Sequence, residues 1–430
     1  MAGPGDSGPG VPATARSPTT TRDSIPPMLG VYVHIPFCRV KCPYCSFNVY
    51  VKRHDVRAAY VDALIDELRL HADAVADAPF LPRAADGRAL VSSIYLGGGT
   101  PTLLDPSDLA RVVEAVRCSF AVLPDAELTV ETEPGTTTAE VFAALADLGA
   151  NRLTIGVQSF QPALLERLGR PHSGDDARRA VADARAAGVS NLDLDLMFGA
   201  PEQTLSDWQA DLDAALALGP EHLSLYNLTI EPGTPFHTAH GKGLLPLPDE
   251  DVQADMLRDA IRTCAAAGLE HYELSNFARP GSRSRHNQGY WQGRPYLGVG
   301  AGAHGFLPSP PHGRRWWNLR SPARYVEAVR GGRLPVDASE ELDAAQALLE
   351  ALFLGLRQRD GLDVAALGQR FGAGIVTALR SASSLPVPDL VSWRGDRLRL
   401  TDNGVIIADS VIETLSRRLD STDAFDTVGI

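Results

Sequence analysis

Short apolar runs alternate with longer amphipathic segments between residues 30 and 230. Six runs rich in β-branched and aromatic residues are predicted strands: 31–35, 92–96, 127–131, 152–157, 191–198 and 222–228. Segments with helical spacing lie between them, often after a capping Thr, Ser or Asp: 56–76, 106–120, 137–148, 173–187 and 204–217. Successive strand–helix units favour a parallel sheet with helices outside. We expect an α/β fold with a partial, TIM-like (β/α)6 barrel over 30–230, because the alternation stops there.

The chain beyond residue 230 has a different pattern. Residues 231–337 are rich in glycine and aromatic residues, and we expect a region that covers the barrel, with short strands and one helix near 249–267. Residues 338–430 contain a hairpin-like WRGDRLRLT and three helical patterns, at 341–358, 362–381 and 402–418. This order predicts a C-terminal α+β, winged-helix-like module for packing or partner contacts.

The first 29 residues are rich in Pro, Gly, Ser and Thr and lack an apolar run. We expect a disordered tail that is neither a signal peptide nor an anchor. No later segment has the ~18 consecutive apolar residues of a spanning helix, so no membrane span is expected.

Charge and cysteine content narrow the class of protein. The chain has 53 acidic and 40 basic residues, a net charge of −13, which argues against nucleic acid or an anionic membrane as the main partner. Three of the five cysteines lie within eight residues, unlike a secreted disulfide framework, so a cytoplasmic location is expected. Cys118 and Cys264 stand singly in Ala-rich helical windows, as small core residues do.

Cys38, Cys42 and Cys45 have the spacing C-x3-C-x2-C directly after the strand at 31–35. A four-iron cluster normally takes four thiolates, so three on one loop leave one iron open to a chelating cofactor. A closed zinc site with His34 as fourth ligand is the alternative, but a residue within the strand does not reach freely around the loop. A catalytic thiol is less favoured, since nothing distinguishes one cysteine as nucleophile.

The run Tyr32-Val-His-Ile-Pro-Phe-Cys38, followed by this spacing, resembles the opening of radical S-adenosylmethionine (SAM) proteins. In particular it resembles the branch that contains oxygen-independent coproporphyrinogen III oxidase and the heme chaperone HemW. The resemblance extends from about residue 30 to 420. It implies a 4Fe–4S cluster on the three cysteines, SAM on the open iron, and one-electron cleavage of SAM to methionine and a 5′-deoxyadenosyl radical.

The resemblance also assigns polar and aromatic residues near successive strand ends to SAM binding: Tyr32, Tyr44, Gly98, Gly99, Thr100, Glu131, Gln158, Arg170 and Asp195. In the family the glycine turn binds the methionine amino group, and Tyr44 is expected on the adenine side. The guanidinium of Arg170 suits a carboxylate. Gln158 and Asp195 match positions on the ribose side. Barrel active sites lie at these strand ends.

Within this branch, Phe47 favours the chaperone, because the oxidase carries a further cysteine at that position. The segment His286-Asn287-Gln-Gly-Tyr290-Trp291 resembles the one linked to heme in the HemW family. Imidazole ligates iron and flat rings pack on a porphyrin. The alternative is that this segment fixes a covering loop, with His304 as a rival iron ligand. Glu133 is a departure, since asparagine is commoner there.

The sequence therefore predicts a radical SAM protein that binds heme as cargo and transfers it to an acceptor protein. It also predicts an electron donor to the cluster. The alternatives are an oxygen-independent coproporphyrinogen III oxidase, or another radical enzyme acting on a porphyrin-like substrate.

Overall fold

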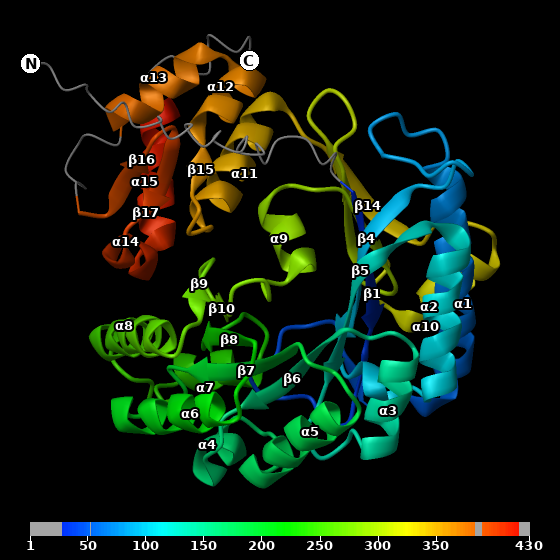
Figure 1. Cartoon of the computed structure of the whole chain (residues 1–430), viewed down its shortest axis with the longest axis horizontal. Helices are drawn as coiled ribbons and strands as arrows, with labels where there is room; N and C mark the ends of the chain where they lie inside the picture. Colours follow the sequence, from blue (N-terminus) through cyan, green and yellow to red (C-terminus); the bar gives the residue numbers. More distant parts are fainter. Residues whose placement is uncertain (1–27, 52, 383–388, 421–430) are drawn as a thin grey trace, which may run out of the picture.

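A computed structural model describes residues 28–51, 53–382 and 389–420, and the tail expected at 1–29 lies almost wholly outside these ranges. The six expected strands are confirmed and pair in parallel, in chain order (Figure 1). They are β1 (Leu29–Ile35), β4 (Leu90–Gly98), β5 (Ala121–Thr132), β6 (Arg152–Gln158), β7 (Leu192–Phe198) and β8 (His222–Asn227).

The expected helices connect these strands and cover the outer face of the sheet. They are α1 (Arg57–Ala74), α2 (Pro106–Ser119), α3 (Ala139–Asp147), α5 (Gly174–Ala186) and α6 (Leu205–Ala217). Thr138, Ser173 and Thr204 cap three of them, because each side chain accepts a hydrogen bond from a first-turn amide. The short helix α4 (Pro162–Arg167) was not expected.

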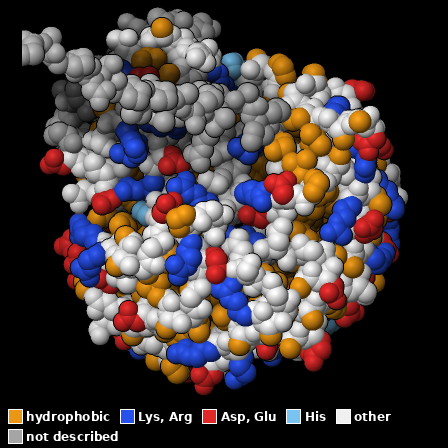
Figure 2. Space-filling model, viewed as in Figure 1, with side chains coloured by type: hydrophobic (Ala, Val, Ile, Leu, Met, Phe, Trp, Pro, Cys, Tyr) orange, Lys and Arg blue, Asp and Glu red, His pale blue; other side chains and the backbone are white. Residues whose placement is uncertain are grey.

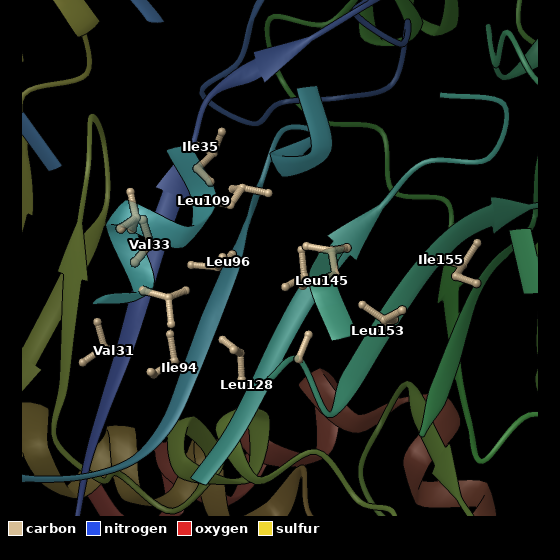
Figure 3. Packing of buried hydrophobic residues seen from close by; sticks show 14 of the residues in the cluster. Val31, Val33, Ile35, Ile94, Leu96, Leu109, Leu128, Leu145, Leu153 and Ile155 are labelled. Carbon is tan, nitrogen blue, oxygen red and sulfur yellow. The ribbon is translucent and has the colours of Figure 1, made fainter. Parts of the chain in front are cut away.

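The main hydrophobic core lies between the sheet and these helices. Figure 3 shows aliphatic side chains of neighbouring strands, such as Val33 and Leu96, lying close to Leu109 of α2 and Leu145 of α3. These four side chains are buried. Cys264 is buried as expected, but Cys118 is exposed, because the buried stripe of α2 runs through residues 109, 112, 113 and 116 and misses position 118.

Residues 231–337 do more than cover the barrel, which corrects the expectation from sequence. Together with residues 338–341, which complete the last strand, they extend the same sheet to twelve strands, at both of its edges. Beside β1 lie β11 (Tyr296–Val299), β12 (His304–Leu307), β13 (Arg314–Asn318) and β14 (Val336–Glu341). Beside β8 lie β10 (Asn276–Ala278) and β9 (Glu270–His271). These strands are short, and β11 and β12 contain glycine, so their sequence pattern is weak.

Four helices also belong to this segment: α7 (Pro235–Gly241), α8 (Glu250–Ala266), α9 (Arg285–Trp291) and α10 (Pro322–Arg330). Only α8 was expected. The segment of α9 lies between the sheet and the C-terminal module (Figure 1).

The C-terminal module has its own three-stranded sheet and its own apolar cluster. Its elements are α11 (Ala344–Leu356), β15 (Leu362–Asp363), α12 (Val364–Phe371), α13 (Ala373–Ala382), β16 (Val391–Arg394), β17 (Arg397–Leu400), α14 (Asp402–Ile406) and α15 (Ala408–Asp420). The helix expected at 362–381 is divided at Gly372, whose φ of +101° is a left-handed backbone conformation that breaks a helix. The helix expected at 402–418 is likewise two helices.

Basic and acidic side chains are intermingled over the face shown in Figure 2, so the acidic excess is not gathered into one patch there. Among the described residues, no helix is both long enough and apolar enough to cross a bilayer.

Candidate functional site

The three clustered cysteines lie on a loop that leaves the carboxyl end of β1. The base of this loop is closed by β2 (Phe37–Cys38) and β3 (Tyr50–Val51), which pair in parallel. Burial raises the pKa of Cys38 to about 12 and also raises the pKa of Cys45. Both thiols therefore carry protons that a metal would displace on binding. Within the described ranges, no three His, Cys, Asp or Glu side chains surround a single point closely enough to hold one ion.

His34, the fourth ligand that a zinc site would require, is held inside the barrel. Its Nδ1 lies 3.0 Å from the hydroxyl of Tyr32, and its Nε2 lies 3.0 Å from the carbonyl oxygen of Asn48. Burial lowers the pKa of His34, which favours the neutral ring. Both ring nitrogens are engaged, so His34 has no free nitrogen for the cysteine loop. Tyr32, expected near SAM, has its hydroxyl on His34.

The glycine turn after β4 packs tightly against the start of the cysteine loop. The amide of Gly99 donates to the Ile35 carbonyl at 2.9 Å, and the amide of Thr100 donates to the Phe37 carbonyl at 2.7 Å. A Cβ atom on Gly99 would lie 2.6 Å from the Phe37 carbonyl oxygen, and Gly98 has a φ of +107°. Only glycine fits these two positions, so the turn fixes the backbone beside Cys38.

Glu131 is a half-buried carboxylate at the end of β5. It accepts hydrogen bonds from the hydroxyl of Tyr95 at 2.9 Å and from the amide of Gly98 at 2.8 Å. Burial raises its pKa, and these two donors oppose that shift. Glu131 therefore connects the glycine turn to the barrel interior. Tyr95 was missed from sequence, although alternation along SSIYL places it on the inner face.

Arg170 brings positive charge to the cysteine loop. One guanidinium nitrogen lies 3.5 Å from the sulfur of Cys42, and the other lies 3.2 Å from Glu133 and donates to the Gly156 carbonyl. Its Nε is buried without a hydrogen-bond partner. Glu133, which sequence marked only as a departure, is therefore the carboxylate that Arg170 contacts here. The charge of Arg170 opposes the rise in the pKa of Cys45 that burial causes.

Asp195 on β7 and Gln158 at the end of β6 both show unusual local features. The Oδ1 of Asp195 is buried without a hydrogen-bond partner, and burial together with the charges of Asp193 and Glu131 raises its pKa well above the ordinary value. Gln158 has a φ of +63°, a conformation that residues other than glycine rarely adopt. Orphaned acceptors and backbone strain of this kind cluster at ligand sites.

Tyr44 packs on a small apolar cluster. Its ring lies 6.2 Å from that of Phe236, and this cluster also contains Leu164 and Met197. The amide of Phe236 donates to the carbonyl of Pro43 at 3.0 Å, which attaches the cysteine loop to α7. Tyr44 therefore lines an apolar wall beside the thiols.

The segment linked to heme lies at the opposite end of the barrel. His286 is 3% exposed, and its Nδ1 and Nε2 lie 2.9 Å from the Ser93 hydroxyl and 2.8 Å from the Tyr290 hydroxyl. Ser93 pairs with Gly30 at the start of β1, about 16 Å along the strand from Ile35 before the cysteine loop. His286 cannot reach a ligand without losing one of these bonds. Asn287 and Trp291 are half-buried.

His304, the rival iron ligand, lies at the start of β12 and is exposed. Its ring stacks on Trp317 at 5.9 Å. It is not brought together with His286.

A buried polar network beneath α9 was also missed from sequence. Glu127 accepts hydrogen bonds from the backbone amides of Arg285 and His286, at 2.9 and 3.0 Å. Asp193 contacts His222 at 2.7 Å and Arg152 at 3.4 Å. Charged residues within otherwise apolar strands, Glu127, Arg152 and Asp193, were the available signal, because such residues are rarely buried unless they are paired.

The residues at the carboxyl end fit a 4Fe–4S cluster and SAM. Three thiols lie on one loop, an unpaired carboxylate oxygen on Asp195 is an acceptor for hydroxyl groups, and Arg170 is a donor for a carboxylate. The glycine turn brings backbone close to the same space.

Comparison with known proteins agrees with this geometry. A family model described as the Radical SAM superfamily matches residues 32–215, and the HemN C-terminal domain matches residues 342–407. Heme chaperone HemW of Mycobacterium tuberculosis is 38% identical over 90% of this chain and 94% of its own length. HemW of Escherichia coli is 40% identical over 71% of this chain and 78% of its own.

A mitochondrial relative from Bos taurus, radical S-adenosyl methionine domain-containing protein 1, is 36% identical over 90% of this chain and 87% of its own. Among solved structures, the coproporphyrinogen III oxidase HemN from Escherichia coli superposes with a TM-score of 0.76 over 90% of each chain, at 23% identity. This likeness supports the fold. Family membership implies a 4Fe–4S cluster and SAM. The chain belongs to the HemW family of the radical SAM superfamily.

Proposed function

We propose that this protein is a heme chaperone on a radical SAM core, which binds heme and transfers it to an acceptor protein. The observation that carries the proposal is the similarity to proteins named heme chaperone HemW, at 38% identity over 90% of the chain. The likeness to the oxidase, at 23% identity, is one of fold.

Phe47 supports the chaperone over the oxidase. It lies in the cysteine loop, where the resemblance gives the oxidase a further cysteine, and it is 65% exposed. A phenyl ring supplies no thiol for chemistry at that position. We therefore expect no conversion of coproporphyrinogen III to protoporphyrinogen IX.

In this proposal Cys38, Cys42 and Cys45 hold the cluster, while Arg170 and Asp195 bind the carboxylate and the ribose of SAM. When bound, the cluster and SAM supply one-electron chemistry. The chain's own residues position the site: Glu131 ties the glycine turn to the barrel, and the apolar wall at Tyr44 excludes water. Arg170 offsets the charge of the thiolates.

The remaining parts of the proposal concern location and partners. A cytoplasmic location keeps the thiols reduced. An electron donor must reach the exposed face of the cysteine loop, where Val40 is 45% exposed. We also propose that residues 30–230, 231–337 and 338–430 act as barrel, barrel-associated region and C-terminal module.

The test is a pair of assays on the anaerobically reconstituted full chain, one with heme and one with coproporphyrinogen III. We expect binding of about one heme per chain and no decarboxylation. A variant with all three cluster cysteines replaced by Ala should still bind heme, because these cysteines lie outside the segment linked to heme, residues 286–291. SAM-dependent decarboxylation of coproporphyrinogen III would show that the protein is the oxidase and not the chaperone. Failure to bind heme would leave a different radical reaction as the function.

A further inference from the structure

A large cavity lies between the α9 segment and the C-terminal module, away from the cysteine loop. Its volume is about 1190 Å³, which is ample for a cofactor-sized ligand. The side-chain amide of Gln358 donates to the Trp291 carbonyl at 2.9 Å and ties the two walls together. Trp291, Phe306 and Leu354 give the cavity apolar and flat surfaces. Of the segment linked to heme, Trp291 lines this cavity, whereas His286 does not.

Arginine dominates the charged lining of this cavity. Seven arginines line it: Arg283, Arg285, Arg294, Arg370, Arg394, Arg397 and Arg399. Only four acidic residues do so: Glu270, Glu350, Asp360 and Asp363. Each of these carboxylates already has an arginine partner. The cavity therefore has a positive excess in a chain whose net charge is −13.

Four of these arginines have no carboxylate partner among the described residues: Arg294, Arg370, Arg394 and Arg399. The Nε of Arg399 is buried without any hydrogen-bond partner. Burial lowers the pKa of Arg294, and no nearby carboxylate opposes that shift. Burial also lowers the pKa of Arg370, where the charge of Glu350 partly opposes the shift and the guanidinium donates to the His312 carbonyl at 3.2 Å. Guanidinium groups in this state are suited to binding carboxylates of a ligand.

His312 adds a metal-binding group to the same cavity. Its ring stacks on Phe371, with a centroid distance of 6.4 Å and an interplanar angle of 15°. Neither ring nitrogen has a hydrogen-bond partner within the described ranges, whereas both nitrogens of His286 are engaged. A free imidazole nitrogen is a good ligand for heme iron.

We propose that this cavity is the heme site. The two propionates bind the unpaired arginines, the macrocycle lies against Trp291 and its apolar neighbours, and His312 coordinates the iron. This inference rests on the proposed chaperone function. It locates heme binding between the barrel and the C-terminal module, so movement of the module would open the site.

The test is a Soret titration of the full chain with ferric heme and with its dimethyl ester, whose propionates carry no charge. The double variant Arg294→Gln, Arg394→Gln should bind ferric heme about tenfold more weakly per arginine lost. It should bind the ester as wild type does, which also shows that the variant is folded. Arg324→Gln is the matched control, because Arg324 is an exposed arginine on α10 that does not line the cavity.

The iron ligand is tested separately with the two histidines. His312→Ala should shift the Soret band, and added imidazole should restore it, whereas His286→Ala should leave the band unchanged. Wild-type affinity for ferric heme in the arginine variant, or an unchanged band in His312→Ala, would overturn this site while leaving the chaperone function intact. Failure of wild type itself to bind heme would overturn both.

Discussion

Asp193 and Asp195 lie two residues apart on β7, with neighbouring partners on β8, yet their environments are opposite. Burial alone would raise the pKa of Asp193, but His222 and Arg152 lower it to about 2. Asp195 has no such partners, and its Oδ1 is buried without a hydrogen bond. Burial and the nearby charges of Asp193 and Glu131 raise the pKa of Asp195 well above its ordinary value.

The same contrast separates the two ends of the barrel. At the amino end, Glu127, Asp193 and His286 are joined in a network of buried hydrogen bonds that holds α9. At the carboxyl end, Asp195 and Arg170 keep buried polar atoms without partners, and Gln158 is strained. A polar group that is fully paired stabilises the fold, whereas an unpaired one costs free energy until a ligand binds. The paired polar groups therefore mark the amino end of the barrel as structural, and the unpaired ones mark the carboxyl end as functional.

The largest effect should come from the cysteine loop. Replacing Cys38, Cys42 or Cys45 by Ala should abolish assembly of the cluster, since each supplies an irreplaceable thiolate. Iron analysis after anaerobic reconstitution should find about four irons in wild type and in the controls Cys118→Ala and Cys264→Ala. Stoichiometric zinc, with no cluster formed, would contradict the assignment.

At the structural end, His286→Ala should lower the free energy of unfolding by about 3 kcal/mol, because it leaves a void and removes partners from Ser93 and Tyr290. Urea denaturation measures this loss. Asn287→Ala is a neighbouring control whose half-buried side chain should matter less. If His286→Ala is as stable as wild type, the contacts of His286 with Ser93 and Tyr290 do not stabilise the amino end of the barrel.

At the functional end, Arg170→Ala and Asp195→Ala should each weaken SAM binding about tenfold or more while iron content stays unchanged. Each variant removes a group that has buried atoms free for a ligand. Equilibrium binding to the reduced, cluster-loaded protein gives the affinity. If both variants bind SAM as tightly as wild type, Arg170 and Asp195 are not SAM-binding residues.

The sharpest comparison makes the same change at two neighbouring positions. Asp193→Asn should destabilise the protein by about 2 kcal/mol at neutral pH, following its lowered pKa. Asp193 contributes this stability above pH ~4, its unfolded pKa, and loses it as the pH falls toward 2. Asp195→Asn should leave stability unchanged or raise it, because it removes a charge that burial disfavours. If urea denaturation shows the same loss of stability for both variants, the proposed difference between Asp193 and Asp195 is wrong.

Much of the barrel could be predicted because the strands 31–35 to 222–228 are apolar runs separated by capped amphipathic helices. The strands of residues 231–337 could not, since YLGV and HGFL are too short to show alternation and their pairing with β1 and with each other is set by tertiary contacts. Cysteine spacing indicated the metal loop because ligand spacing is local in sequence.

Partners across the barrel were harder to predict. The bond between Tyr95 and Glu131 joins residues 36 positions apart, and Glu127 binds α9 across more than 150 positions. No local pattern encodes such pairs. Assignment of His286 to the side of the barrel away from the cysteines likewise required the structure.

The pairing of β2 with β3 has a further consequence for how the cluster is loaded. Phe37 pairs with Tyr50 and Cys38 pairs with Val51, so the cysteine loop is already a closed ring when the barrel has folded. The entropy of bringing the loop ends together is lost during folding rather than during metal uptake. Cluster assembly is then insertion into a preformed ring, and oxidative loss of iron need not unravel the sheet beneath.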